Sequence, residues 1–135
     1  MNILIDTNIV LDLLLEREPY VESATAIFDH VERGTLTGYL AATTITNIFY
    51  ILRKAQGRDV ALASIRRLLI GLQLCAVDRQ TVETALSLGL TDFEDGIQLA
   101  CASLAQLDAI VTRDAQDFRD STLPIYSPTD LLSQL

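Results

Sequence analysis

The chain has 135 residues, of which 50% are hydrophobic, and its 10 basic and 18 acidic side chains give a net charge of −8. This length fits one domain with a sizeable core, and the acidic balance argues against a polyanion-binding protein that acts through charge alone. The sequence has no apolar run near the roughly 20 residues that cross a bilayer, no basic N-terminal region and no CxxC spacing. We therefore expect a single cytoplasmic domain over residues 1–135, not bound to a membrane, with Cys75 and Cys101 as buried free thiols.

Short apolar stretches alternate with segments of helical periodicity along the chain. The predicted elements are, in order, a strand over 2–6, a helix over 9–15, a helix from Pro19 to Gly34, a strand over 37–41, a helix capped by Thr43 or Thr44 and ending at Ala55, a helix over 58–72, a strand over 74–77, helices over 79–88 and 92–107, a strand over 109–112, a turn or short helix over 114–120, a strand over 125–126 and a helix over 128–135. This order predicts an α/β three-layer sandwich with a short, mainly parallel central sheet and helices on both faces.

Asp6 directly follows the first predicted strand, in the stretch MNILIDTNIV. Ligands of parallel sheets bind beyond the carboxyl ends of the strands, where the strand order reverses, so Asp6 lies at the functional edge. The alternative is that Asp6 caps the next helix, because Asp accepts backbone N–H bonds at helix starts. Equivalent carboxylates elsewhere decide between these interpretations.

Two further stretches place acids at the same edge. In VTRDAQDF, Asp114 follows the strand over 109–112 and Asp117 comes one helical turn later. In LTDFEDGIQLACA, Asp92 is a natural N-cap, with Glu94 and Asp95 in the first turn; taken alone, these acids are ordinary helix-dipole chemistry.

Clustered carboxylates repel one another unless a cation joins them, and an all-oxygen ligand set suits Mg²⁺ or Mn²⁺. Zinc is not expected, because the lone His30 lies on the second predicted helix, where we expect it to be solvated. The patterns GxxxxGK(S/T), GxGxxG and GxSxG are absent from the sequence, which excludes nucleotide-loop and serine-hydrolase sites of these kinds.

The stretches LIDTNIVLD, DFEDGIQLACA and IVTRDAQDF resemble, in order and spacing, the successive acidic motifs of PIN domains, the ribonuclease fold of VapC-type toxins. The resemblance covers nearly the whole chain and implies a PIN-like sheet. It implies catalytic and metal-ligand roles for Asp6, Asp95 and Asp114. It also places further residues near the site: Asn8 and Thr112 as flanking polar residues, and Asp92 and Asp117 as auxiliary acids.

One position departs from the pattern. Many PIN nucleases carry a glutamate on the helix after the second strand, and Asn47 stands at this place in AATTITNIFYILRK. An amide oxygen is an uncharged and weaker ligand, so we expect one metal to be held well and a second poorly. The simpler interpretation is a helix residue bonded to a neighbouring carbonyl group.

The implied activity is metal-dependent hydrolysis of RNA phosphodiester bonds, with an antitoxin protein as partner when the protein is a toxin. Because acidic walls repel RNA, the metal and arginines such as Arg113 have to attract it. The helix after the second strand is apolar around much of its circumference, which predicts a homodimer. Alternatively, the helix over 58–72 covers this surface.

Three rival interpretations remain. The first is a catalytically weak or inactive PIN domain that acts as an RNA- or protein-interaction module. The second is a phosphoryl-transfer protein with Asp6 as nucleophile; it is weakened because Lys54 is mid-helix and Asn8 stands where a second acid is needed. The third makes every acid a helix cap and requires several coincidences at one edge.

Overall fold

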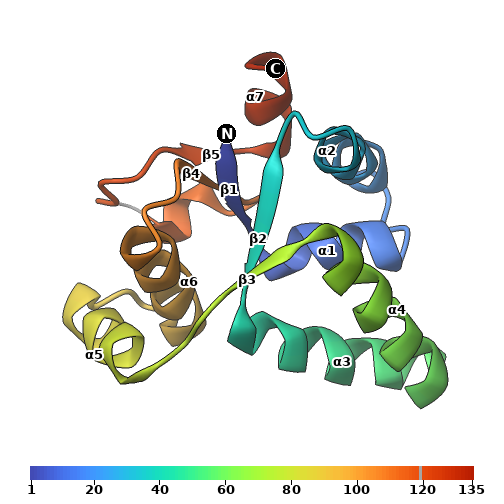
Figure 1. Cartoon of the computed structure of the whole chain (residues 1–135), viewed down its shortest axis with the longest axis horizontal. Coiled ribbons are helices and arrows are strands. Elements are labelled where there is room, and N and C mark those ends of the chain that lie inside the picture. The colour runs from blue at the N-terminus through green and yellow to red at the C-terminus, as the bar shows by residue number, and fades with distance from the viewer. Residues whose placement is uncertain (119) are drawn as a thin grey trace.

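The computed structural model describes residues 1–118 and 120–135 and confirms the α/β fold, with a central sheet between helices (Figure 1). Its elements are β1 (Asn2–Ile5), α1 (Thr7–Leu14), α2 (Val21–Glu32), β2 (Thr37–Ala41), α3 (Ala42–Gln56), α4 (Arg58–Gly71), β3 (Gln73–Cys75), α5 (Arg79–Leu88), α6 (Phe93–Leu104), β4 (Ala109–Val111), the 3₁₀ helix η1 (Ala115–Phe118), β5 (Ile125–Tyr126) and α7 (Pro128–Ser133). The predicted segment over 114–120 includes residue 119, which is outside the described residues.

The five strands are parallel and lie in the order β3-β2-β1-β4-β5. The chain builds outward from β1 through β2 to β3, then returns to the other side of β1 with β4 and β5. The strand order therefore reverses between β1 and β4. Ligand sites of open α/β sheets lie beyond the carboxyl ends of the strands at such a reversal.

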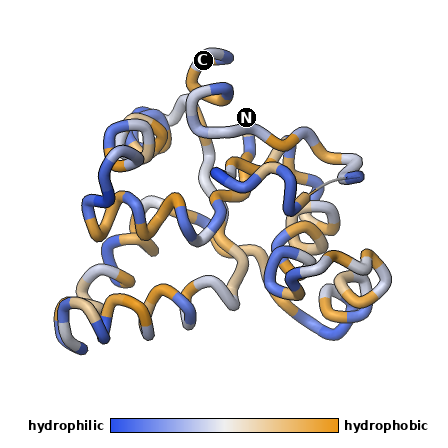
Figure 2. Tube along the Cα trace, turned by 180° about the vertical axis from the view of Figure 1, so that it is seen from behind, coloured by the Kyte–Doolittle hydropathy of each residue, from blue (hydrophilic) through white to orange (hydrophobic). Residues whose placement is uncertain are grey.

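Two apolar cores cover the two faces of the sheet, because alternate strand residues point to opposite faces. Ile3 and Ile5 of β1 pack with the helices α1 to α4 and α7, whereas Leu4 packs with α5, α6 and η1. Figure 1 shows α5 and α6 on the side of the sheet away from α2 and α4. The tube in Figure 2 alternates between hydrophilic and hydrophobic segments along the surrounding helices, as expected for amphipathic helices.

Three predicted helix starts are wrong. Helix α2 begins at Val21 and not at Pro19, which lies in the turn before it. Helix α1 begins at Thr7, not at residue 9, because the chain turns directly out of β1. Helix α3 begins at Ala42 without a threonine cap: Ala41 holds the N-cap position with φ −66° and ψ 140°, and no side chain caps the helix. The hydroxyl of Thr44 is buried, and its oxygen lies 3.3 Å from the hydroxyl oxygen of Thr7.

Cys75 and Cys101 are buried and free, as predicted. His30 differs from the prediction, since its side chain is only partly exposed and its Nδ1 is buried without a hydrogen-bond partner in the described part of the chain. None of the helices in residues 1–118 and 120–135 is both long and apolar enough to cross a membrane.

Candidate active site

The Asp6 carboxylate is bonded to side chains of other elements and not as a cap of the helix that it precedes. Asp6 holds the N-cap position of α1, but its side chain makes no capping hydrogen bond there. Instead Oδ2 accepts a hydrogen bond from Thr112 Oγ1 at 2.8 Å, and Oδ1 accepts one from Gln98 Nε2 at 3.0 Å. The residue is 5% exposed. Helix capping therefore does not account for this carboxylate.

Gln98 is a site residue that the sequence prediction missed. It lies one turn after Asp95 on α6 and is fully buried. Besides its bond to Asp6, its Nε2 lies 3.5 Å from Asp95 Oδ1, so one amide group joins the two carboxylates. Its Oε1 is buried without a hydrogen-bond partner among the described residues. The signal that could have found it is its position three residues after Asp95, which places both side chains on the same face of the helix.

The first turn of α6 carries its acids as predicted. Asp92 is the N-cap, and its Oδ1 accepts a hydrogen bond from the backbone N–H of Asp95 at 3.2 Å. Glu94 Oε1 accepts a hydrogen bond from Thr7 Oγ1 at 3.1 Å. These side chains line a pocket of about 330 Å³. Its lining residues are Asp6, Thr7, Asn8, Leu11, Asn47, Tyr50, Ile51, Asp92, Glu94 and Asp95.

Thr112 connects Asp6 to Asp114 across the sheet reversal. While its hydroxyl donates to Asp6, the same oxygen accepts a hydrogen bond from the backbone N–H of Asp114 at 3.0 Å. Asp114 is exposed, and its carbonyl oxygen accepts a backbone hydrogen bond from Asp117 at 2.9 Å as η1 begins. The end of β4 thus places an exposed carboxylate next to the end of β1.

Burial and like charges shape the acidity of the site. Burial raises the pKa of Asp6, and the Asp114 charge adds to this rise. Burial, followed by the charge of Asp92, raises the pKa of Asp95 to about 7. Because none of these carboxylates has a cationic partner within residues 1–118 and 120–135, a cation bound among them would relieve their repulsion.

The donor set fits a hard divalent cation in chemistry, since carboxylate and amide oxygens are the ligands that Mg²⁺ and Mn²⁺ prefer. Within the described residues, however, no three His, Cys, Asp or Glu side chains are already arranged to hold a metal ion. A shared cation therefore depends on movement of at least one carboxylate, and Asp114 is the exposed member.

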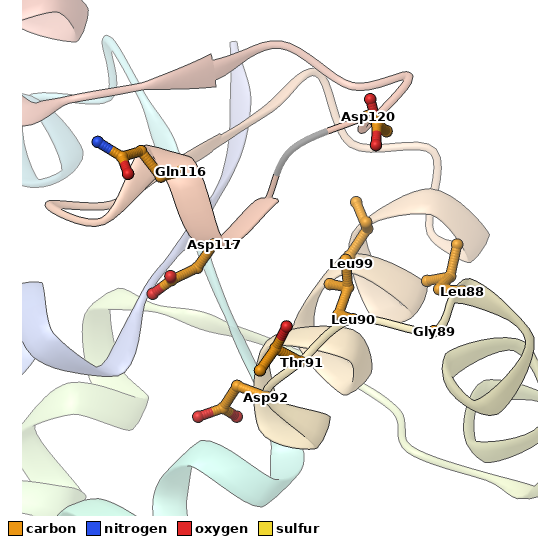
Figure 3. A pocket seen from close by; sticks show the side chains of 9 residues that line it. All are labelled: Leu88, Gly89, Leu90, Thr91, Asp92, Leu99, Gln116, Asp117 and Asp120. Carbon is orange, nitrogen blue, oxygen red and sulfur yellow. The ribbon is translucent and has the colours of Figure 1, made fainter.

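The two auxiliary acids lie around a neighbouring pocket of about 240 Å³ that shares Asp92 with the first one. Figure 3 shows Asp92 and Asp117 on one side of this pocket and Leu88 on the other. Asp92 comes from the start of α6 and Asp117 from η1. The structure thus brings Asp117 to the border of the site.

Arg113 is held at the border of the site by two side chains, and its predicted role in attracting RNA stays a prediction. Its guanidinium group binds Asp12 of α1 through Nε at 2.7 Å and a terminal nitrogen at 3.2 Å. It also lies over the ring of Tyr20, 3.9 Å from the ring centroid. The sequence prediction missed Asp12, although a lone acid in the apolar run IVLDLLL was a signal, because a buried carboxylate needs a partner.

A parallel sheet with carboxylates gathered at its strand-order reversal defines an α/β protein with an acidic cluster at the carboxyl edge of its sheet. The family described as PIN domain matches residues 2–116, so the chain belongs to the PIN-domain family and the resemblance of its motifs is confirmed. No curated protein matches the chain in sequence.

Solved structures share the fold. VapBC-1 from nontypeable Haemophilus influenzae aligns with a TM-score of 0.73 and 16% identity, over 96% of this chain and 99% of that chain. A toxin-antitoxin complex from Klebsiella pneumoniae gives 0.70 and 22%, over 93% and 96%. The Sarcin-Ricin loop cleaving toxin VapC20 of Mycobacterium tuberculosis gives 0.66 and 14%, over 80% and 86%. At these identities the likeness establishes the fold.

Proposed function

We propose that residues 1–135 form a single PIN-like domain that hydrolyses RNA phosphodiester bonds with Mg²⁺ or Mn²⁺ in the cytoplasm. The observation that carries the proposal is the Asp6 carboxylate, which is buried at the strand-order reversal, bonded to Thr112 and Gln98 and not used as a helix cap. A buried acid directed into a pocket with other acids destabilises the fold, so a functional role accounts for its presence.

Asp6, Asp95 and Asp114 are the residues that would hold the cation. When bound, it supplies positive charge to the scissile phosphate and lowers the pKa of an attacking water. Thr112 and Gln98 orient Asp6, because one hydrogen-bond donor contacts each of its carboxylate oxygens. Glu94, in the same pocket, is a carboxylate that accepts the proton of the attacking water.

A second candidate is a catalytically weak PIN domain that serves as an RNA- or protein-interaction module. Asn47 supports it, because this amide lines the pocket of Asp6 and Asp95 at the place where a further acid was expected. A site with one charge fewer holds a second cation poorly.

The partners proposed are an RNA substrate, an antitoxin protein and a second copy of the chain. The antitoxin is suggested by the similar structures, which include a toxin-antitoxin complex. The second copy is suggested by exposed apolar side chains on adjacent helices: Tyr50 and Ile51 on α3 are 59% and 39% exposed, and Leu69 and Ile70 on α4 are 47% and 87% exposed.

The test is cleavage of a labelled RNA by the purified chain with Mn²⁺, with Mg²⁺ and with a chelator. We expect cleavage that requires the cation and is abolished in Asp6→Asn, which keeps the size of the side chain and removes its charge. Asp59→Asn, an exposed acid on α4, is the matched control and should retain activity. RNA that stays intact with the wild-type chain, while Mn²⁺ binds, would favour the interaction module.

A further inference from the structure

Asp12 and Arg113 form an ion pair beside the candidate site. Asp12 lies on α1 with its side chain 0% exposed, and the Arg113 side chain is 22% exposed. Two guanidinium nitrogens contact the two carboxylate oxygens at 2.7 and 3.2 Å, the geometry of a bidentate pair. Tyr20 covers the guanidinium group at 3.9 Å, and Arg17 approaches the same carboxylate at 3.8 Å.

The pair joins two of the three segments that carry the proposed catalytic acids, those of Asp6 and Asp114. Arg113 lies between Thr112, which binds Asp6, and Asp114, whose backbone N–H binds Thr112. Helix α1, which carries Asp12, begins directly after Asp6. Strand β4 ends at Val111, and the backbone N–H of Thr112 still donates a hydrogen bond to the Tyr126 carbonyl oxygen of β5 at 2.9 Å, so Arg113 is the first residue after this contact. The side chain of Arg113 attaches this segment to α1.

We propose that Asp12 is a positioning residue that acts through Arg113: their ion pair fixes the backbone of the segment leaving β4, from which the Asp114 carboxylate can turn toward Asp6. This inference rests on the proposed function, because it concerns the same cation site. Arg113 is thereby a part of the scaffold and not a contact for RNA. Its charge is already paired with Asp12, and its side chain is mostly covered.

A double variant keeps the shape of the pair and removes both charges. Asp12→Asn/Arg113→Gln avoids leaving a buried carboxylate without a partner, which is the expected fault of Arg113→Gln alone. The matched control is Arg79→Gln/Glu83→Gln on α5, which removes a 2.8 Å ion pair whose side chains are 91% and 60% exposed. Arg113→Lys tests the geometry, because lysine keeps the charge but lacks the two-nitrogen contact.

The measurements are the Mn²⁺ dissociation constant by calorimetry, kcat and KM for RNA, and the unfolding temperature. For the Asp12→Asn/Arg113→Gln variant we expect the Mn²⁺ dissociation constant to rise and kcat to fall by about 10- to 100-fold, as for other residues that orient metal ligands. The KM of this variant should stay unchanged. The Mn²⁺ dissociation constant and kcat of Arg113→Lys should lie between those of this variant and the wild type. Both values of the α5 control should match those of the wild type.

Any of three results would overturn the proposal. A lower unfolding temperature with wild-type Mn²⁺ binding and kcat would make the pair purely structural. A raised KM with unchanged kcat and a weaker salt dependence would make Arg113 an RNA phosphate contact. The calorimetry separates this inference from the proposed function. Weaker Mn²⁺ binding by the variant supports positioning even if the wild type cleaves no RNA, and a wild type that binds no Mn²⁺ refutes it.

Discussion

Gln98 donates a hydrogen bond from Nε2 to Oδ1 of Asp6 at 3.0 Å, and the two residues are 92 positions apart in the chain. The same nitrogen lies 3.5 Å from Asp95 Oδ1. A neutral amide thus occupies the place between two carboxylates where a positive group would be expected. It orients both acids without neutralising either, so the negative charge of the two carboxylates remains available to bind a cation.

Replacing Gln98 with leucine should weaken cation binding and destabilise the fold. The Asp6 oxygen would lose its donor in a buried place, at a cost of about 1–3 kcal/mol in the free energy of unfolding. Mn²⁺ affinity should fall about 10- to 100-fold, because an orienting partner is lost. Calorimetry and urea unfolding measure the two effects. Gln80→Leu on α5 is the exposed control, and equal Mn²⁺ binding by both variants would remove Gln98 from the site.

The stability of the metal-free protein should fall as the pH rises from about 5 to 7.5. Asp95 has a pKa of about 7 in the folded chain, whereas an aspartate in an unfolded chain has a pKa of about 3.9. Between these values the folded state binds more protons than the unfolded state, so the free energy of unfolding decreases with rising pH. Burial of Asp6 raises its pKa and adds to the same trend.

Urea unfolding at a series of pH values checks this dependence. Asp95→Asn should flatten it, since the variant has no carboxylate at this position to titrate. Mn²⁺ should stabilise the wild type most at the upper end of the range. Identical pH dependence in the wild type and the variant would show that Asp95 retains an ordinary pKa.

Asn47→Glu should strengthen cation binding, because it adds a charged oxygen to a pocket that already contains Asp6 and Asp95. Calorimetry of the folded variant should show a lower Mn²⁺ dissociation constant. Thr46→Glu adds the same charge one position earlier on α3, where the side chain is exposed and outside the pocket lining, and is the control. An unchanged constant in Asn47→Glu would place this residue outside the cation site.

The apolar surface on α3 and α4 should associate two copies of the chain. Helix α4 packs on α3 and covers Ile48 and Leu52, as the alternative interpretation expected, but Tyr50 and Ile70 stay exposed. Sedimentation should therefore show a dimer of this 14.9 kDa chain, which Ile70→Glu dissociates. A wild-type monomer at every concentration would leave this surface for another partner.

The sequence predicted the order of strands and helices because their periods were clear, although β3, α6, β4 and α7 differ from their predicted bounds. Strand β2 and helix α5 have the predicted bounds, whereas α3 starts before its expected threonine cap because it follows β2 without a loop. Sheet geometry predicted acids at one edge, because strand ends and helix starts meet there. The resemblance to PIN domains selected Asp6, Asp95 and Asp114 among them, and their role as cation ligands stays a prediction.

Gln98 and Asp12 were missed for a physical reason. Both are buried polar residues inside helices, and their importance depends on partners that are distant in the sequence. The partner of Gln98 is Asp6, and the partner of Asp12 is Arg113. Helical periodicity gives the face on which such a residue lies, but it does not give the side chain of another element with which the residue forms a hydrogen bond or an ion pair.

The most direct test of the central claim is an anomalous difference map from crystals soaked in Mn²⁺. The claim is that Asp6, Asp95 and Asp114 hold one cation at the reversal between β1 and β4. We predict a single strong peak bounded by oxygens of these three carboxylates, with the Asp114 side chain turned toward Asp6. No peak at this edge, or a peak held by Asp92 and Asp120 in the neighbouring pocket instead, would contradict the account.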